Sequence, residues 1–278
     1  SATIMMRRNL VVTYTCLGEY RQAQDYVHQT RAAVRSTQAE SNHALLLNFV
    51  GFWLLQQARL EEAKITQSEA LCILQRHKQQ LWMVKAITAL GWIAFYSGDW
   101  QEAEAQSSEG IAESEVFGED RQIAHSLTCR GWARLKLGRA DAAIPDFERS
   151  AEILLRLEME NRAQEPLAGL AQAAWQNGDL SAAQSQASAV AAHLLSHPLD
   201  RTTDTFLAIH TCHAILCAAG DPLAEEVCGL AQAHLEYRAS HIEPEHLDGF
   251  WAMPGHKEFG PSGTQAGRNK AFGSAPVE

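Results

Sequence analysis

Apolar residues recur along most of the chain at the spacing of one helical face, and short turns interrupt them at regular intervals. In one such segment they stand at Leu60, Ala63, Ala70 and Leu74, three to seven residues apart, with charged positions between them. The pattern predicts paired helices. First helices are expected over 4–17, 44–57, 84–97, 124–137, 164–177 and 204–219, and second, longer helices over 20–36, 60–78, 100–117, 140–158, 180–196 and 223–239.

A period of 40 residues relates the pairs to one another. Alanines recur at 23, 63, 103, 143 and 183, and twelve residues before an alanine stands a second small residue, as at Gly51, Gly91, Gly131 and Ala171. Helices approach to about 8–10 Å only where the contact positions are small, so Gly91 is expected to pack near Ala103. A single pair cannot bury its apolar face, so neighbouring pairs must stack. The sequence predicts an all-α, right-handed α-α superhelix of about six hairpins with nearest-neighbour contacts.

The turns inside the pairs carry residues that end one helix and begin the next. Glycine suits the left-handed conformation that closes a helix, and it stands at 18, 98, 138, 178 and 220. The aspartates Asp99, Asp179 and Asp221 follow these glycines and can accept hydrogen bonds from the free N–H groups of the next helix. We therefore expect tight turns at these positions.

Composition narrows the function classes. The chain has 278 residues, 46% of them apolar, and its 33 acidic against 23 basic residues give a formal charge of −10. A protein that binds the phosphate backbone needs a cationic surface, so direct contact with nucleic acid is not expected. The six cysteines form no C-x-x-C pair and indicate reduced thiols in a cytoplasmic protein. No apolar run reaches the roughly 18–20 residues that span a bilayer, so no membrane partner is expected.

The repeat resembles the tetratricopeptide repeat (TPR) in its pattern of a large apolar residue, a small residue and an alanine. One unit has Leu90-Gly91 and Ala103, and the next has Gly131, Ala143 and Phe147. The period is 40 where that repeat has about 34, and the proline that usually closes the second helix is absent. Forty-residue units of this kind are similar to those of bacterial signal-transduction ATPases, transcriptional regulators and TPR-linked adenylate or guanylate cyclases.

The C-terminal segment resembles the end of the repeat domain in those proteins. Residues 248–259 contain an aromatic pair, Met253-Pro254 and His256-Lys257-Glu258, and should fold back as a capping helix over the last pair. We therefore divide the chain into a solenoid with its cap over 1–259 and a disordered, Gly- and Ser-rich tail over 260–278.

The resemblance implies that the first helices line a concave face that binds a protein or peptide partner. By register, that face would consist of Asn48, Phe52, Gln56, Lys85, Thr88, Trp92, Tyr96, His125, Thr128, Trp132, Lys136, Gln172, Trp175 and Gln176. Aromatic side chains with interleaved polar groups suit an extended or helical peptide. The tryptophans could instead pack between repeats. The Lys and Asn set of carboxylate-clamp repeats is absent, so an acidic C-terminal peptide is not expected.

Two clusters of possible metal ligands stand outside this face. His210, Cys212, His213 and Cys217 fall on one predicted helix, with His213 and Cys217 at a spacing of four. The segment 241–246 holds two histidines and two glutamates. Both clusters are also explained by ordinary packing or exposure, so we predict no metal site, no cofactor and no catalytic residue.

The sequence favours a non-catalytic module for protein-protein interaction or signal reception, as part of a larger bacterial regulatory protein in signal transduction or transcription regulation. The first alternative is a TPR receptor for a short peptide or small-molecule signal, and the second, less favoured alternative is an α/α-superhelical enzyme. A homodimer is compatible with all three. An enzyme would require a convergent cluster of titratable groups.

Overall fold

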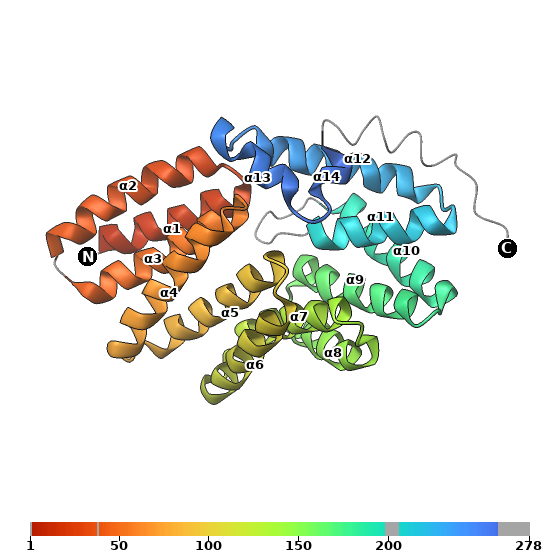
Figure 1. Cartoon of the computed structure of the whole chain (residues 1–278), viewed down its shortest axis with the longest axis horizontal. Coiled ribbons are helices and arrows are strands. Elements are labelled where there is room, and N and C mark those ends of the chain that lie inside the picture. Colours follow the sequence, from red (N-terminus) through yellow and green to blue (C-terminus); the bar gives the residue numbers. More distant parts are fainter. Residues whose placement is uncertain (1, 38, 198–205, 261–278) are drawn as a thin grey trace.

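The computed structural model describes residues 2–37, 39–197 and 206–260, which contain helices and no strand. Six hairpins follow one another in these ranges (Figure 1). The helices are α1 (Ala2–Leu17), α2 (Tyr20–Thr37), α3 (Glu40–Gln56), α4 (Leu60–Arg76), α5 (Gln80–Tyr96), α6 (Trp100–Phe117), α7 (Asp120–Lys136), α8 (Ala140–Arg156), α9 (Glu160–Gln176), α10 (Leu180–Ser196), α11 (Phe206–Ala219) and α12 (Leu223–Ala239). The predicted all-α, TPR-like solenoid is confirmed.

The helices begin at a regular spacing of 20 residues. Helices α2 to α10 start at residues 20, 40, 60, 80, 100, 120, 140, 160 and 180. Each turn between α3 and α10 contains one residue of positive φ, between 54° and 82°: Ala58, Lys78, Gly98, Gly118, Gly138, Glu158 and Gly178. Two backbone hydrogen bonds fix such a turn; at Lys78 they run from its N–H to the Gln75 oxygen at 3.1 Å and from the Gln79 N–H to the Leu74 oxygen at 3.0 Å. This arrangement holds even non-glycine residues in the left-handed region.

The aspartate caps are confirmed, whereas a longer second helix is found in only some of the pairs. Asp99 and Asp179 accept hydrogen bonds from the third N–H of α6 and α10 at 3.2 Å and 3.0 Å. The second helices α2 and α6 have 18 residues, against 16 in α1 and 17 in α5, whereas both helices have 17 residues in the pairs α3–α4, α7–α8 and α9–α10. The first helices α3, α5, α7 and α9 start four residues earlier than predicted. The turns before α5 and α9, at Lys78 and Glu158, lack the glycine that marks a turn in sequence, whereas the turn before α7 contains Gly118.

Small residues set the distance between the helices of a pair. A Cβ added at Gly91 would lie 3.0 Å from Ser107 Oγ and 3.7 Å from the Ala103 oxygen, which confirms the predicted contact. A Cβ at Gly131 or Gly169 would lie 2.6 Å or 2.5 Å from the ring of Phe147. The fully buried ring therefore needs glycine on both sides.

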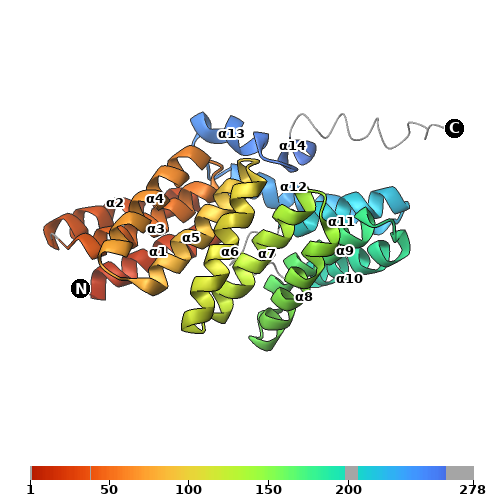
Figure 2. The same ribbon diagram turned by 60° about the horizontal axis from the view of Figure 1, so that its bottom comes forward.

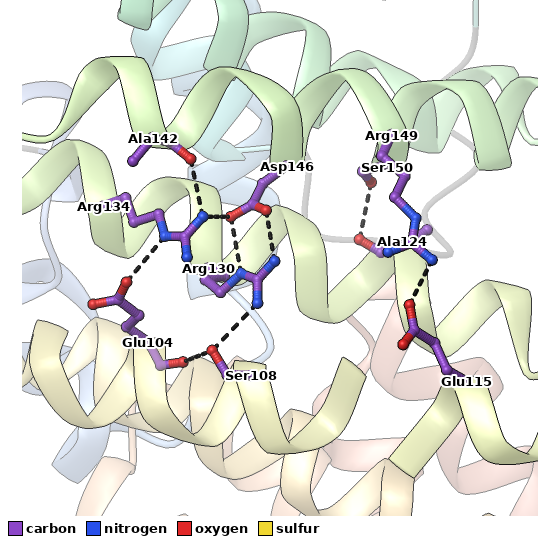
Figure 3. A network of polar contacts seen from close by, with 10 residues as sticks. All are labelled: Glu104, Ser108, Glu115, Ala124, Arg130, Arg134, Ala142, Asp146, Arg149 and Ser150. Atoms are coloured by element: carbon purple, nitrogen blue, oxygen red, sulfur yellow. Dashed lines mark hydrogen bonds and ion pairs between the residues drawn. The ribbon is translucent and has the colours of Figure 1, made fainter. Parts of the chain in front are cut away.

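A polar network joins α6, α7 and α8 (Figure 3). Asp146, which is 3% exposed, accepts hydrogen bonds from Arg130 Nη2 at 2.7 Å and from Arg134 Nη1 at 2.8 Å. Glu104 accepts a hydrogen bond from Arg134 Nε at 3.0 Å and also pairs with Arg139. Each arginine of this network therefore contacts a carboxylate, as buried charges require.

The predicted capping segment folds back over the last pair. It forms η1 (Pro244–His246), α13 (Leu247–Ala252) and α14 (His256–Phe259). The Phe259 ring lies edge-on to Phe206 of α11, with the ring centroids 5.8 Å apart, and Phe250 is buried. Figure 2 shows α13 and α14 above the ends of the preceding helices. Apart from Gly260, the predicted tail lies outside the described residues.

The first and last hairpins touch, which corrects the expectation of nearest-neighbour contacts alone. Tyr237 Oη lies 3.5 Å from Glu19 Oε1, and Arg238 Nη2 donates to Gln56 Oε1 at 3.1 Å. A Cβ added at Gly18 would lie 3.1 Å from Arg238 Cγ. The array thus curves until α12 and α13 reach the N-terminal helices (Figure 1). Among the described residues, no helix combines the length and apolar character needed to cross a bilayer.

Candidate functional site

A hollow of about 260 Å³ opens among the first helices, and we call it the groove hollow. Its lining comes mainly from α3, α5 and α7, with single or paired contributions from α1, α4 and α9. Eight predicted residues lie there: Asn48, Phe52, Gln56, Lys85, Thr88, Trp92, Tyr96 and His125. The other lining residues were not predicted from sequence; they are Val12, Phe49, Leu55, Gln67, Trp82, Ala89, Arg121, Gln122, Arg162 and Glu165.

Four of the missed residues, Trp82, Arg121, Gln122 and Arg162, share a cause, because they lie before the predicted first helices. Trp82, Gln122 and Arg162 stand 40 residues apart and form one column along the hollow. The predicted first helices began at 84, 124 and 164, so this column was assigned to turns. In the structure α5, α7 and α9 begin at 80, 120 and 160, and the column falls in their first turns. A search for left-handed turns at every twentieth residue would have found it.

Aromatic rings form the walls of the groove hollow. Phe49 of α3 and Trp82 of α5 meet edge to face, with centroids 5.4 Å apart. Trp92 stacks on Tyr96 at 5.8 Å and lies 5.5 Å from the ring of His125. Rigid aromatic surfaces of this kind give a bound side chain contact area at a low cost in conformational entropy.

Buried amides hold two of these walls together. Asn48 Nδ2 donates to the Trp82 oxygen at 3.0 Å, which ties α3 to α5. Gln67 is fully buried and its Nε2 donates to the Asn48 oxygen at 2.9 Å, while its Oε1 has no hydrogen-bond partner. The indole N–H of Trp92 is likewise buried without a partner. These two atoms leave one acceptor and one donor unused in residues that line the hollow.

Positive charge predominates in the lining, although the chain as a whole is acidic. Lys85, Arg121 and Arg162 line the hollow against one carboxylate, Glu165. The Lys85 ammonium lies 4.3 Å from the centroid of the Trp82 ring. Burial lowers the pKa of Lys85 and the charge of Arg121 lowers it further, while Glu119 acts in the opposite direction. The protein therefore bears an energetic cost to keep this cation in place.

His125 stands on the α7 side of the hollow as a neutral ring. Burial, with a smaller contribution from the charge of Arg162, lowers the pKa of His125 to about 3. Near neutral pH the ring therefore offers one donor and one acceptor and no charge.

The remaining predicted partner-binding residues lie outside the groove hollow. Thr128 is buried and donates to the Ala124 oxygen at 3.0 Å. Trp132 is 2% exposed and lies edge-on to Phe147 at 5.4 Å, so it packs inside the array. Farther along α7 and α9, Lys136 and Gln176 are exposed and Gln172 and Trp175 are half-buried.

The two candidate metal clusters do not converge. Cys217 Sγ lies 3.3 Å from His213 Nε2, and His210 Nε2 lies 3.3 Å from Glu258 Oε2, as separate pairs. In the second segment Glu243 faces Arg21 at 3.4 Å. Across the described ranges, no group of three or more histidine, cysteine, aspartate or glutamate side chains is placed to hold a metal ion.

The buried cysteines are poor nucleophiles. Burial raises the pKa of Cys129 and of Cys212 to about 12, so both remain protonated thiols near neutral pH. Cys72 and Cys217 are exposed.

A second, wider hollow of about 540 Å³ lies where the turn after α3 faces η1 and α13. Its arginine is already paired, since Arg59 donates two hydrogen bonds of 2.7 Å and 2.6 Å to the carboxylate of Glu62. Arg59 also lies over the ring of Trp53 at 5.5 Å. This hollow is therefore a weaker candidate for a ligand than the groove hollow.

None of the protein-family models matches the sequence, and neither does any curated protein sequence. Solved structures do match the fold. A Rap protein complexed with competence and sporulation factor has a TM-score of 0.66 at 15% identity, over 94% of this chain and 73% of that one. The apo form of RapI has a TM-score of 0.64 at 12% identity, over 98% of this chain and all of that one.

A third match is a signal-transduction ATPase with numerous domains and a tetratricopeptide-repeat sensor, from Pyrococcus horikoshii. Its TM-score is 0.57 at 16% identity, over 84% of this chain and 36% of that one. At such low identities these matches bear on the fold alone. The resemblance that the repeat register indicates is thus confirmed at the level of architecture: this chain has the fold of tetratricopeptide-repeat proteins.

Proposed function

We propose that this chain is a non-catalytic protein-interaction module that binds a peptide segment of a partner protein in the groove hollow. The observation that carries the proposal is the lining itself. Three successive first helices, α3, α5 and α7, place aromatic rings, amides and cations around one space of about 260 Å³. Rigid aromatic anchors combined with polar groups are typical of peptide-binding grooves.

The structural matches support a role in signal reception. One is a Rap protein complexed with competence and sporulation factor, and another carries a tetratricopeptide-repeat sensor within a larger ATPase. The present chain covers 36% of that ATPase. We infer that it serves as the sensor part of a larger regulatory protein, in which binding at the groove hollow is passed to other domains.

A receptor for a short peptide or a small molecule is the second candidate. The contacts of α12 with α3 and with the turn between α1 and α2 favour it, because they tie the ends of the array together. Gln56 takes part in both features, since it lines the groove hollow and accepts a hydrogen bond from Arg238. A ligand at Gln56 would then influence the contact between the ends.

The test is to fill the hollow and measure peptide binding. Ala89 lines the hollow on α5, so Ala89→Trp would occupy the space that a ligand needs. The matched control is Ala105→Trp, at an exposed alanine of the second helix α6. Peptides are selected from a displayed random library on the whole chain, and their affinities are measured by calorimetry.

We expect Ala89→Trp to weaken the selected peptides at least about tenfold and Ala105→Trp to leave them unchanged. Circular dichroism establishes that both variants keep their helices. Peptides that bind the parent and Ala89→Trp equally would contradict the proposal. So would a selection that enriches no peptide.

A further inference from the structure

Two cations, Arg8 and Lys85, lie against the aromatic pair Phe49 and Trp82 of the groove hollow and form no ion pair with a carboxylate of the described residues. Arg8 of α1 lies 5.8 Å from the centroid of the Phe49 ring, Phe49 meets Trp82 edge to face, and Lys85 lies 4.3 Å over Trp82. Arg8 is 7% exposed, and its Nε and Nη1 have no hydrogen-bond partner. Desolvation lowers the pKa of both Arg8 and Lys85.

Arg121 adds a third positive charge beside Lys85. It lines the hollow from the start of α7, and its charge is close enough to Lys85 to act on it. Within the described part of the chain, the side chains of Arg8, Lys85 and Arg121 make no ion pair or hydrogen bond, in contrast to the arginines near Asp146. Two carboxylates lie nearby, Glu119, which acts electrostatically on Lys85, and Glu165 in the lining beside Arg162. The Lys85 side of the hollow thus retains a positive charge that an anion would neutralise.

We propose that the groove hollow binds an acidic side chain of the partner peptide, with Lys85 and Arg121 contacting the carboxylate and Trp82 and Trp92 packing against its methylene groups and apolar neighbour. This inference rests on the proposed peptide-binding function and adds the chemistry of the anchor. The buried indole N–H of Trp92, which has no partner, supplies a neutral donor in the same lining. Charge-assisted hydrogen bonds are the strongest that a surface site offers a carboxylate.

The size and position of the groove hollow favour an internal acidic side chain of the peptide over its C-terminal carboxylate as the bound group. At about 260 Å³ it is smaller than the roughly 300–1,000 Å³ of small-molecule pockets, so it fits one anchor residue. It lies at α3, α5 and α7, with α1 and α9 contributing at its two sides, so a peptide can continue in both directions from the anchor. The expected motif is Glu or Asp next to an aromatic or aliphatic residue.

From sequence, an acidic C-terminal peptide is not expected, because the Lys and Asn set of carboxylate-clamp repeats is absent. The structure supplies cations from other columns, at Lys85 and at Arg121 in the first turn of α7. Arg121 lies in the stretch that the predicted helix bounds assigned to a turn.

The experiment compares the selected peptide with neutral versions of itself on the whole chain. One version replaces the acidic anchor residue with its amide, Glu→Gln or Asp→Asn, and a second version carries an amidated C-terminus. We expect the anchor amide to bind at least about tenfold more weakly and C-terminal amidation to have no effect. The affinity of the acidic peptide should fall as salt rises, and that of the anchor amide should change less.

The protein variants are Lys85→Met and Arg121→Gln, with Lys136→Met as the control at an exposed lysine of α7. Each of the first two should weaken the acidic peptide about three- to tenfold and leave the anchor amide unchanged, and Lys136→Met should alter neither. Melting curves of all variants show whether folding is kept. Peptides that lose binding in Ala89→Trp but carry no acidic residue, or that depend on their C-terminal carboxylate, would overturn this inference while the proposed function stands.

Discussion

Two regions of this array hold cations among packed helices, and they hold them differently. At the junction of α6, α7 and α8, Arg130 and Arg134 share the carboxylate of Asp146, and Arg134 also reaches Glu104 (Figure 3). In the groove hollow, Lys85 lies against the ring of Trp82 and meets no carboxylate within ion-pair distance. The arginines of the first region form ion pairs with carboxylates of the chain, and Lys85 and Arg121 of the second region form none with the described residues.

This difference distinguishes a network that stabilises the fold, around Asp146, from a candidate binding site, the groove hollow. A buried ion pair with its hydrogen bonds complete contributes little net stability but is costly to break. A cation kept at an aromatic wall without a partner lowers stability and leaves its attraction available to a ligand. Changing one residue at a time in each region tests this contrast.

The largest effect on stability is expected from Asp146→Ala. This change would leave Arg130 and Arg134 without their shared carboxylate, as Lys85 in the groove hollow has no carboxylate partner among the described residues. Two guanidinium groups, each about one-fifth exposed, would lose their shared carboxylate. The free energy of unfolding should fall by about 3 kcal/mol, measured by urea denaturation. The control is Glu152→Ala, at an exposed glutamate of the same helix. A loss no larger than that of the control would show that the network does not stabilise the fold.

An intermediate effect is expected from His125→Gln, and it should depend on pH. His125 has a folded pKa of about 3, whereas an unfolded histidine titrates near 6.5. As the pH falls below about 6.5, the unfolded chain binds a proton that the folded chain does not, so the parent loses stability toward pH 3. Between about pH 7.5 and 5 the parent should lose about 2 kcal/mol more than the variant.

Urea denaturation at the two pH values measures this difference. The exposed His28 supplies the control variant, His28→Gln, which should follow the parent. Equal pH dependence in the parent and in His125→Gln would mean that His125 takes up a proton in the folded chain. The groove hollow would then carry a further positive charge at mildly acidic pH.

The smallest effect is expected from Lys85→Met in the absence of any ligand. The change removes a charge that burial disfavours, as the lowered pKa of Lys85 shows, and it gives up one cation–π contact. Because the two contributions oppose each other, we expect a gain in stability of about 0.5 kcal/mol. Thermal denaturation beside Lys136→Met measures it. A loss above about 1 kcal/mol would assign Lys85 a structural role and remove the contrast between the regions.

Sequence reasoning recovered the array because its causes are local. Left-handed glycines and aspartate caps act within one turn, and the alanines and glycines at a 40-residue period report contacts within one pair. It failed at the turns between pairs, where Lys78 and Glu158 adopt a conformation that their residue types do not signal. That error hid the column of Trp82, Gln122 and Arg162, and with it one side of the groove hollow.

The sequence by itself determined the helices, their pairing and eight of the eighteen residues that line the hollow, because helix faces and turn residues are encoded by nearby positions. The tertiary structure alone decided that α12 reaches back to α3 and to the turn between α1 and α2, and that Trp132 packs on Phe147 while Trp92 lines a hollow. Both outcomes depend on the curvature of the array, which sums small rotations between successive pairs. The residues of one pair do not show the total curvature, because it arises only when all the pairs are stacked.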